Sequence, residues 1–189
     1  MTVTHETALP ETRTRLPDST MLDDALFETS TGGTDRCTDL PPTQARRDSI
    51  IELLNDSLAT ELVCELRYKR HYFTSESLVA PKIAEEFLGY ANEESLHADR
   101  LARRIVQIGG QPDYSPDSLA RRSFVDYDDS CELEAMISAD LAAERIVIER
   151  FLQIIRQIGD SDPTTRQLLQ DILSDEEDQA EELKEWLDD

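Results

Sequence analysis

Two short segments pair a possible metal-binding side chain with a carboxylate three residues before it. In EESLH, Glu94 precedes His97 by three residues, so a helix would place a carboxylate and an imidazole on one face, where both can bind the same metal ion. In SDEEDQ, Glu176 and Gln179 have the same spacing. One such pair arises easily by chance in a chain rich in glutamate. It therefore indicates a metal site only if other residues of the chain support the same site.

Two further glutamates and a tyrosine lie in apolar stretches. Glu61 lies within LATELVCEL and Glu144 within ISADLAAERIVI, and Tyr68 follows Glu61 by two helical turns on the same stripe. Each of four expected helices then carries one carboxylate that should face inward. Buried carboxylates without partners are costly, and four together are intolerable without cations. Two divalent ions would offset these charges, which predicts a dinuclear metal centre.

Four long helical stretches are expected to position these residues, at about 44–75, 77–108, 130–158 and 163–187. Apolar residues recur at helical spacing along each stretch, including Leu66 and Leu96, and no alternating β pattern occurs. A link of about twenty residues joins the second stretch to the third, which is long enough to return the chain along a bundle. The predicted fold is all-α, a four-helix bundle with one long crossover, as in ferritin-like folds.

The charge of the 189-residue chain excludes several partners. Its formal net charge of -22 comes from 41 acidic and 19 basic residues, which argues against direct binding to DNA or RNA. No apolar run is long enough to span a membrane, and the start of the chain lacks a signal-peptide core. Only three of the cations are lysines, a composition typical of salt-adapted proteins. We therefore expect a cytoplasmic protein from a halophile.

Composition also divides the chain into two parts. Residues 1–42 are rich in Thr, Pro, Gly and Asp, which predicts a disordered acidic tail, and residues 43–189 are expected to form the bundle domain. The three cysteines, Cys37, Cys64 and Cys131, are isolated and odd in number. This argues against a disulfide framework and against a metal site built from cysteine pairs. Cys64 and Cys131 are expected to be small buried hydrophobic residues.

Four segments carry a resemblance to a known family: ELVCELRY, EESLHADR, SADLAAE and ILSDEEDQAEELKEWL. Residues from about 50 to 187 resemble the bacterioferritin branch of the ferritin-like superfamily. The resemblance implies a dinuclear ferroxidase centre that binds two iron ions, with manganese as the alternative metal. The metal ligands that it implies are Glu61, Glu94, His97, Glu144 and Glu176. Tyr68 matches the tyrosine beside that centre, which implies a catalytic role as a hydrogen-bond partner and single-electron donor.

Three departures from the family pattern change what the resemblance implies. Gln179 stands where a second histidine is expected, and its neutral amide oxygen is a weaker ligand than imidazole, so one metal should bind loosely. Ser95 stands where haem-binding members carry an axial methionine, so no haem is predicted. The sequence ends two residues after Leu187, without the short fifth helix of the 24-subunit cages. This favours a DPS-like (DPSL) miniferritin, with a dodecamer preferred over a 24-mer or a dimer.

A few other polar residues receive expectations from their position alone. Asp140 is a candidate to hold the free ring nitrogen of His97. His71 has no partner by spacing and is expected on the surface, and Glu93 and Glu177 are also expected to be exposed.

The leading functional hypothesis is a ferroxidase that oxidises Fe(II) with O2 or H2O2, for iron storage and protection against oxidative stress. Two alternatives stay open. One is a rubrerythrin-like or manganese-containing peroxidase or oxidase that forms a dimer and stores no iron. The other is a non-catalytic ferritin-like protein, with Gln179 as the sign of a decayed site.

Overall fold

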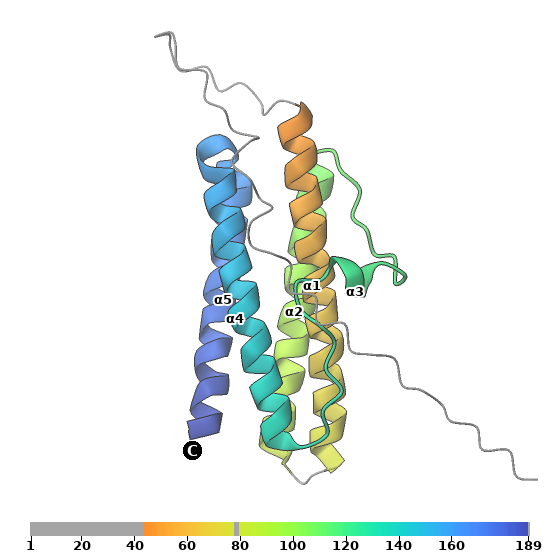
Figure 1. The fold of residues 1–189 in the computed structure, drawn as a ribbon, viewed down its shortest axis with the longest axis vertical. Helices are drawn as coiled ribbons and strands as arrows, with labels where there is room; N and C mark the ends of the chain where they lie inside the picture. The colour runs from red at the N-terminus through yellow and green to blue at the C-terminus, as the bar shows by residue number, and fades with distance from the viewer. Residues whose placement is uncertain (1–43, 78–79, 189) are drawn as a thin grey trace, which may run out of the picture. The chain divides into compact units, whose positions relative to one another are not determined.

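The computed structural model describes residues 44–77 and 80–188. Its elements are α1 (Gln44–Ser77), α2 (Pro81–Gln107), α3 (Leu119–Arg122), α4 (Leu133–Ile158), the 3-10 helix η2 (Gly159–Ser161) and α5 (Pro163–Asp188). No strand occurs among the described residues, which confirms the predicted all-α class (Figure 1). The predicted tail at 1–42 lies outside this part. None of the described helices combines the length and hydrophobicity needed to cross a membrane.

The helix ends follow from residues with special backbone chemistry. α2 begins at Pro81 rather than at residue 77, because proline fits the first helical turn, where an N–H has no helical partner. Gly109 and Gly159 have positive φ angles of 84° and 54°, which turn the chain out of α2 and α4. Asp162 caps α5, since its carboxylate accepts a 3.0 Å hydrogen bond from the backbone N–H of Thr165.

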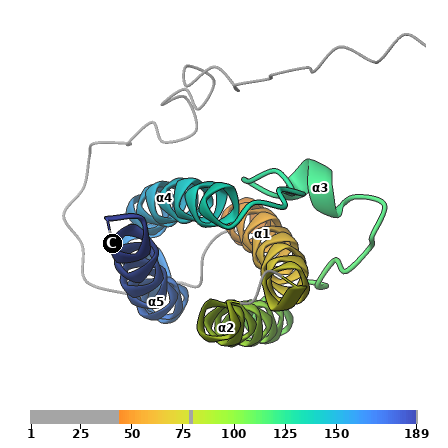
Figure 2. The same ribbon diagram turned by 90° about the horizontal axis from the view of Figure 1, so that it is seen from below.

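The four long helices surround one axis in the order α1, α2, α5, α4 (Figure 2). α1 packs against α2, and α4 packs against α5, as expected for neighbours joined by short links. The segment between α2 and α4 runs along the outside of α1 to the end at which α4 begins (Figure 1). This is the predicted long crossover, although the short helix α3 within it was not predicted.

The core follows the inward stripe of each long helix and includes Leu54, Leu58, Phe87, Leu101, Phe151 and Leu169, all with no exposed surface. Leu66 and Leu96, which share the helical spacing of the apolar residues, do not join this core, because they are 52% and 62% exposed. Each residue advances about 100° around a helix, so Leu66 lies about 140° from Glu61, and Leu96 about 200° from Glu94. The buried glutamates mark the inward face, and these two leucines lie away from it.

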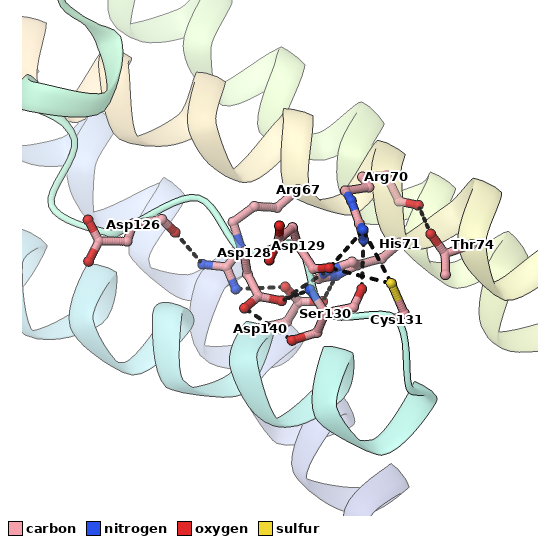
Figure 3. A network of polar contacts seen from close by, with 10 residues as sticks. All are labelled: Arg67, Arg70, His71, Thr74, Asp126, Asp128, Asp129, Ser130, Cys131 and Asp140. Atoms are coloured by element: carbon pink, nitrogen blue, oxygen red, sulfur yellow. Dashed lines mark hydrogen bonds and ion pairs between the residues drawn. The ribbon is translucent and has the colours of Figure 1, made fainter. Parts of the chain in front are cut away.

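A buried polar cluster ties α1 to α4 and to the crossover (Figure 3). Asp140 on α4 accepts a 2.8 Å hydrogen bond from Nη2 of Arg67 and lies 2.7 Å from Nδ1 of His71. Nε2 of His71 lies 3.4 Å from a carboxylate oxygen of Asp128 in the crossover. His71 is fully buried, so its predicted surface position is wrong. The expectation that Asp140 holds His97 is also wrong, because both its oxygens contact α1 residues.

Replacing Asp140 by alanine is expected to lower the free energy of unfolding by about 3 to 5 kcal/mol, because it leaves the buried Arg67 guanidinium without a counter-charge. Urea denaturation of the metal-free protein measures the loss. Asp160→Ala is the matched control, since Asp160 pairs with Arg166 while 94% of its side chain is exposed. That variant should lose less than about 1 kcal/mol. Equal losses in the two variants would contradict a structural role for the buried pair.

Candidate metal centre

All seven predicted site residues lie in the interior of the bundle. Their exposed fractions are 3% or less: Glu61, Tyr68, Glu94, His97, Glu144, Glu176 and Gln179. Each long helix contributes at least one of them, because each places a polar residue on its inward stripe. Such burial is rare for glutamate and requires a compensating partner.

His97 lies among three of the glutamates. Its Nδ1 is 3.0 Å from Oε1 of Glu176, 3.4 Å from Oε2 of Glu61 and 3.7 Å from Oε2 of Glu94. One ligand atom from each of these four residues lies within 4.8 Å of the others. Helices α1, α2 and α5 therefore bring three carboxylates and an imidazole close enough to bind a metal ion.

Glu144 adds the fourth carboxylate from α4. Its Oε1 accepts a 2.5 Å hydrogen bond from the hydroxyl of Tyr68. After desolvation, the charges of Glu176 and Glu94 raise the pKa of the Glu144 carboxyl further. The ring of Tyr68 packs against Tyr90, with 5.3 Å between the ring centroids. Tyr68 is thus fixed at one end by an aromatic contact and at the other by the carboxylate cluster.

Many polar atoms of this cluster have no hydrogen-bond partner. Both carboxylate oxygens of Glu61 and of Glu176 lack one, as do the atoms Oε1 of Glu94, Oε2 of Glu144, Nδ1 of His97 and Oε1 of Gln179. Buried polar groups in folded proteins are nearly always paired, and an unpaired buried acceptor costs about 1 to 3 kcal/mol. So many unpaired acceptors in one place are the pattern expected of a site that cations complete.

Burial also raises the pKa of each carboxyl group in the cluster. For Glu61, Glu94 and Glu144, desolvation is the main cause, and the charge of a neighbouring carboxylate adds to it. The same two causes raise the pKa of Glu176 to about 7. Burial by itself would lower the pKa of His97, but the carboxylates of Glu176, Glu61 and Glu94 close to its ring raise it overall. Burial therefore favours the protonated carboxyls in the metal-free cluster, and a divalent ion must compete with those protons.

An acidic depression of about 630 Å³ lies beside the centre, lined by residues of α2 and α5. His97 and Gln179 form part of its wall. Its other lining residues include two arginines, Arg100 and Arg103, and six acids: Glu86, Glu93, Asp99, Asp175, Asp178 and Glu182. The excess of acids makes this surface attractive to cations next to the buried carboxylates.

Two acids of this depression contact the site residues directly, although sequence reasoning gives them no role. Oδ2 of Asp175 lies 3.2 Å from Nε2 of His97. Oε2 of Glu93 accepts a 3.1 Å hydrogen bond from the amide nitrogen of Gln179. Glu93 is exposed, as predicted. One sequence feature could have pointed to these two acids. Each comes directly before a glutamate that is paired with a second site residue three positions later.

The two described cysteines differ in environment. Cys64 is buried, as predicted, and burial together with the charges of Glu94, Glu144 and Glu61 raises the pKa of its thiol well above the ordinary value. Cys131 is exposed, so its predicted burial is wrong. It lies in the crossover just before α4, where its sulfur is 3.5 Å from Nη2 of Arg70 (Figure 3).

Comparison with known proteins places this bundle in a family. The Ferritin-like domain matches residues 51–189. The chain belongs to the ferritin-like family. This membership agrees with the single-crossover bundle and with buried carboxylates on all four long helices. No curated protein matches the chain in sequence.

Several solved structures share this ferritin-like fold. A dodecameric thioferritin, the bacterioferritin-related protein from Bacteroides fragilis, is 26% identical, with a TM-score of 0.71 over 75% of this chain and 85% of its own. Mycobacterium tuberculosis bacterioferritin is 24% identical, with a TM-score of 0.68 over 79% and 87%. Rhodobacter capsulatus bacterioferritin, described with a metal-free dinuclear site and a haem iron, is 21% identical, with a TM-score of 0.66 over 75% and 84%.

Proposed function

We propose that this protein is a ferroxidase whose substrate, Fe(II), binds as a pair of ions among the four buried glutamates. The supporting observation is the set of unpaired carboxylate oxygens on Glu61, Glu94, Glu144 and Glu176. Carboxylate and imidazole donors suit iron and manganese, and the four carboxylates match the charge of two divalent ions. A pair of carboxylate-bound metals is also the pattern of ferritin-like bundles.

The proposed reaction moves two electrons and two protons. Two Fe(II) ions each give one electron to H2O2, which takes up two protons and yields two water molecules. With O2 as oxidant, the same two electrons and two protons yield H2O2. Both electrons come from one buried pair of ions, so the oxidant is reduced without release of a radical.

Tyr68 is the proposed catalytic residue. Its hydroxyl donates a hydrogen bond to Glu144. When only one Fe(II) is bound, Tyr68 would supply the second electron and one proton that reduce H2O2 to two water molecules, which leaves a tyrosyl radical on the protein. Tyr68→Phe should still bind two ions but oxidise Fe(II) about tenfold more slowly, because one hydrogen bond at the centre is lost. Stopped-flow absorbance measures the rate. Electron paramagnetic resonance, after protein that holds one Fe(II) per chain is mixed with H2O2, should show a tyrosyl signal in the wild type alone. An unchanged rate and an unchanged signal in the variant would remove Tyr68 from the mechanism.

The assembly is proposed to be a dodecameric cage of the DPS-like type that stores the Fe(III) product in the cytoplasm of a halophile. The Bacteroides fragilis protein with this fold is a dodecamer. Its cage would enclose the oxidised iron, and the acidic surface would draw Fe(II) toward the chain. Size-exclusion chromatography at high salt should give about twelve times the chain mass of 21.5 kDa. A mass of twice the chain would favour the peroxidase or oxidase dimer, with manganese as a candidate metal.

The ferroxidase proposal is tested by loading the protein with Fe(II) without oxygen and then adding O2 or H2O2. The expected result is oxidation far faster than in a protein-free blank, with two Fe(II) consumed per H2O2. Oxidation at the blank rate with both oxidants would favour a non-catalytic protein. A visible spectrum of the protein supplied with haem tests the separate expectation, from Ser95, that no haem is bound.

A further inference from the structure

Each of the two helices that line the acidic depression carries an acid immediately before a buried glutamate, and that acid reaches across to the opposite helix. Glu93 precedes Glu94 on α2 and contacts Gln179 on α5. Asp175 precedes Glu176 on α5 and contacts His97 on α2. The two contacts are therefore reciprocal. Because one helical residue turns by about 100°, the preceding acid lies at the rim while the glutamate points inward.

The contact of Glu93 fixes which end of the Gln179 amide faces the interior. An ionised carboxylate only accepts hydrogen bonds, so the amide nitrogen must face Glu93, at 3.1 Å. The amide oxygen is then turned away from Glu93. That oxygen is buried and has no hydrogen-bond partner, and Gln179 follows Glu176 by three residues on the same helix face. An oriented, unpaired oxygen is what a neutral metal ligand requires.

The contact of Asp175 likewise fixes which nitrogen of the His97 imidazole faces the interior. Its carboxylate lies 3.2 Å from Nε2 of His97, so the hydrogen on that nitrogen has an acceptor. Nδ1 then faces Glu176 at 3.0 Å and Glu61 at 3.4 Å. A histidine that binds a metal through one nitrogen commonly donates its other N–H to a carboxylate, which fixes the tautomer and the ring orientation.

We propose that Glu93 and Asp175 are a crossed pair of positioning residues, each of which orients the metal-binding atom of a side chain on the opposite helix. Glu93 turns the oxygen of Gln179 inward, and Asp175 turns Nδ1 of His97 inward. This inference rests on the proposed function, because it assumes that divalent ions bind among the four glutamates. It also gives Gln179 a defined part in the centre, since an oriented amide binds an ion better than one free to rotate.

Titration with Co(II) tests the pair, with ligand-field absorption reporting both the number of ions and their coordination. Glu93→Ala and Asp175→Ala should each weaken the affinity for one Co(II) by about 10- to 100-fold, the range found for residues that orient metal ligands. Glu93→Gln and Asp175→Asn keep an oxygen acceptor without the charge, so they should bind Co(II) nearly as the wild type does. Asp178→Ala, which removes another acid of the depression, is the control and should change little.

A double-mutant cycle separates orientation from general electrostatics. In a Gln179→Ala background, Glu93→Ala should cause no further loss, since no amide is left to orient. Wild-type affinity in both alanine variants would overturn the inference, and so would equal losses in the alanine and amide variants. Wild-type binding of two Co(II) without any Fe(II) oxidation would overturn the proposed ferroxidase alone. Failure of the wild type to bind Co(II) would overturn both.

Discussion

Glu94→Gln should abolish Fe(II) oxidation above the protein-free rate and, at the same time, stabilise the metal-free protein. Glutamine keeps the size of the side chain but removes the charge that a pair of divalent ions needs. Without metal, that same charge is unfavourable, because burial and then the charge of Glu61 raise the pKa of Glu94 well above the ordinary value. A variant that loses Fe(II) oxidation but gains stability identifies a side chain that contributes to activity at a cost in stability.

Two measurements on the same Glu94→Gln preparation check this prediction. Stopped-flow absorbance after anaerobic Fe(II) loading gives the rate, and urea denaturation of metal-free protein at pH 8 gives the free energy of unfolding. That free energy should rise, because the variant no longer buries a carboxyl whose ionisation the interior disfavours. Glu85→Gln, an exposed glutamate on the same helix, should leave both quantities unchanged. A variant that is inactive but less stable would point to simple structural damage.

Divalent metal should stabilise the wild type strongly, and more so as the pH rises. A ligand present at about a thousand times its dissociation constant adds about 4 kcal/mol per site, so two ions add about 8 kcal/mol. For a chain of this size, that corresponds to a rise in Tm of about 15 °C or more. Protons compete with the metal for the carboxylates, so the gain should shrink as the pH falls below about 7, the value to which burial and the charge of Glu94 raise the pKa of Glu176.

The metal-free protein should show the opposite dependence on pH. Glu176 has a folded-state pKa of about 7, raised from 4.5. A raised pKa contributes stability that is fully present below the unfolded value and is lost as the pH rises through the folded value. Calorimetric Tm values between pH 5 and 8, with and without Zn(II), should therefore diverge as the pH rises. Parallel curves, or a metal effect preserved in Glu94→Gln, would contradict binding at the buried glutamates.

Much of the fold and most of the cluster could be predicted from residues within single helices. Apolar spacing gave the four long helices, and glycine and proline gave most of their ends. The buried glutamates were recognisable because each is a charged residue on an apolar stripe. Leu66 and Leu96 show the limit of this reasoning, since apolar character alone did not reveal on which face of the helix they lie.

Contacts between helices could not be predicted in the same way. His71 has no partner by spacing within α1, but Asp140 on α4 and Asp128 in the crossover surround it. In the sequence, Asp175 and Glu93 resemble ordinary surface acids. Their contacts with His97 and Gln179 arise only because α2 and α5 lie side by side. Which acid meets which ligand depends on the relative rotation of two packed helices, and no single-helix pattern contains that information.

The central claim is that two divalent ions complete the cluster of four buried glutamates. Anaerobic equilibrium dialysis against Fe(II) at pH 7.5 and high salt, followed by measurement of iron per chain, tests it most directly. We expect two Fe(II) per chain in the wild type, with the second bound more weakly because Gln179 replaces a histidine, and none in Glu94→Gln. No bound Fe(II) in the wild type, or the same amount in the variant, would contradict the claim.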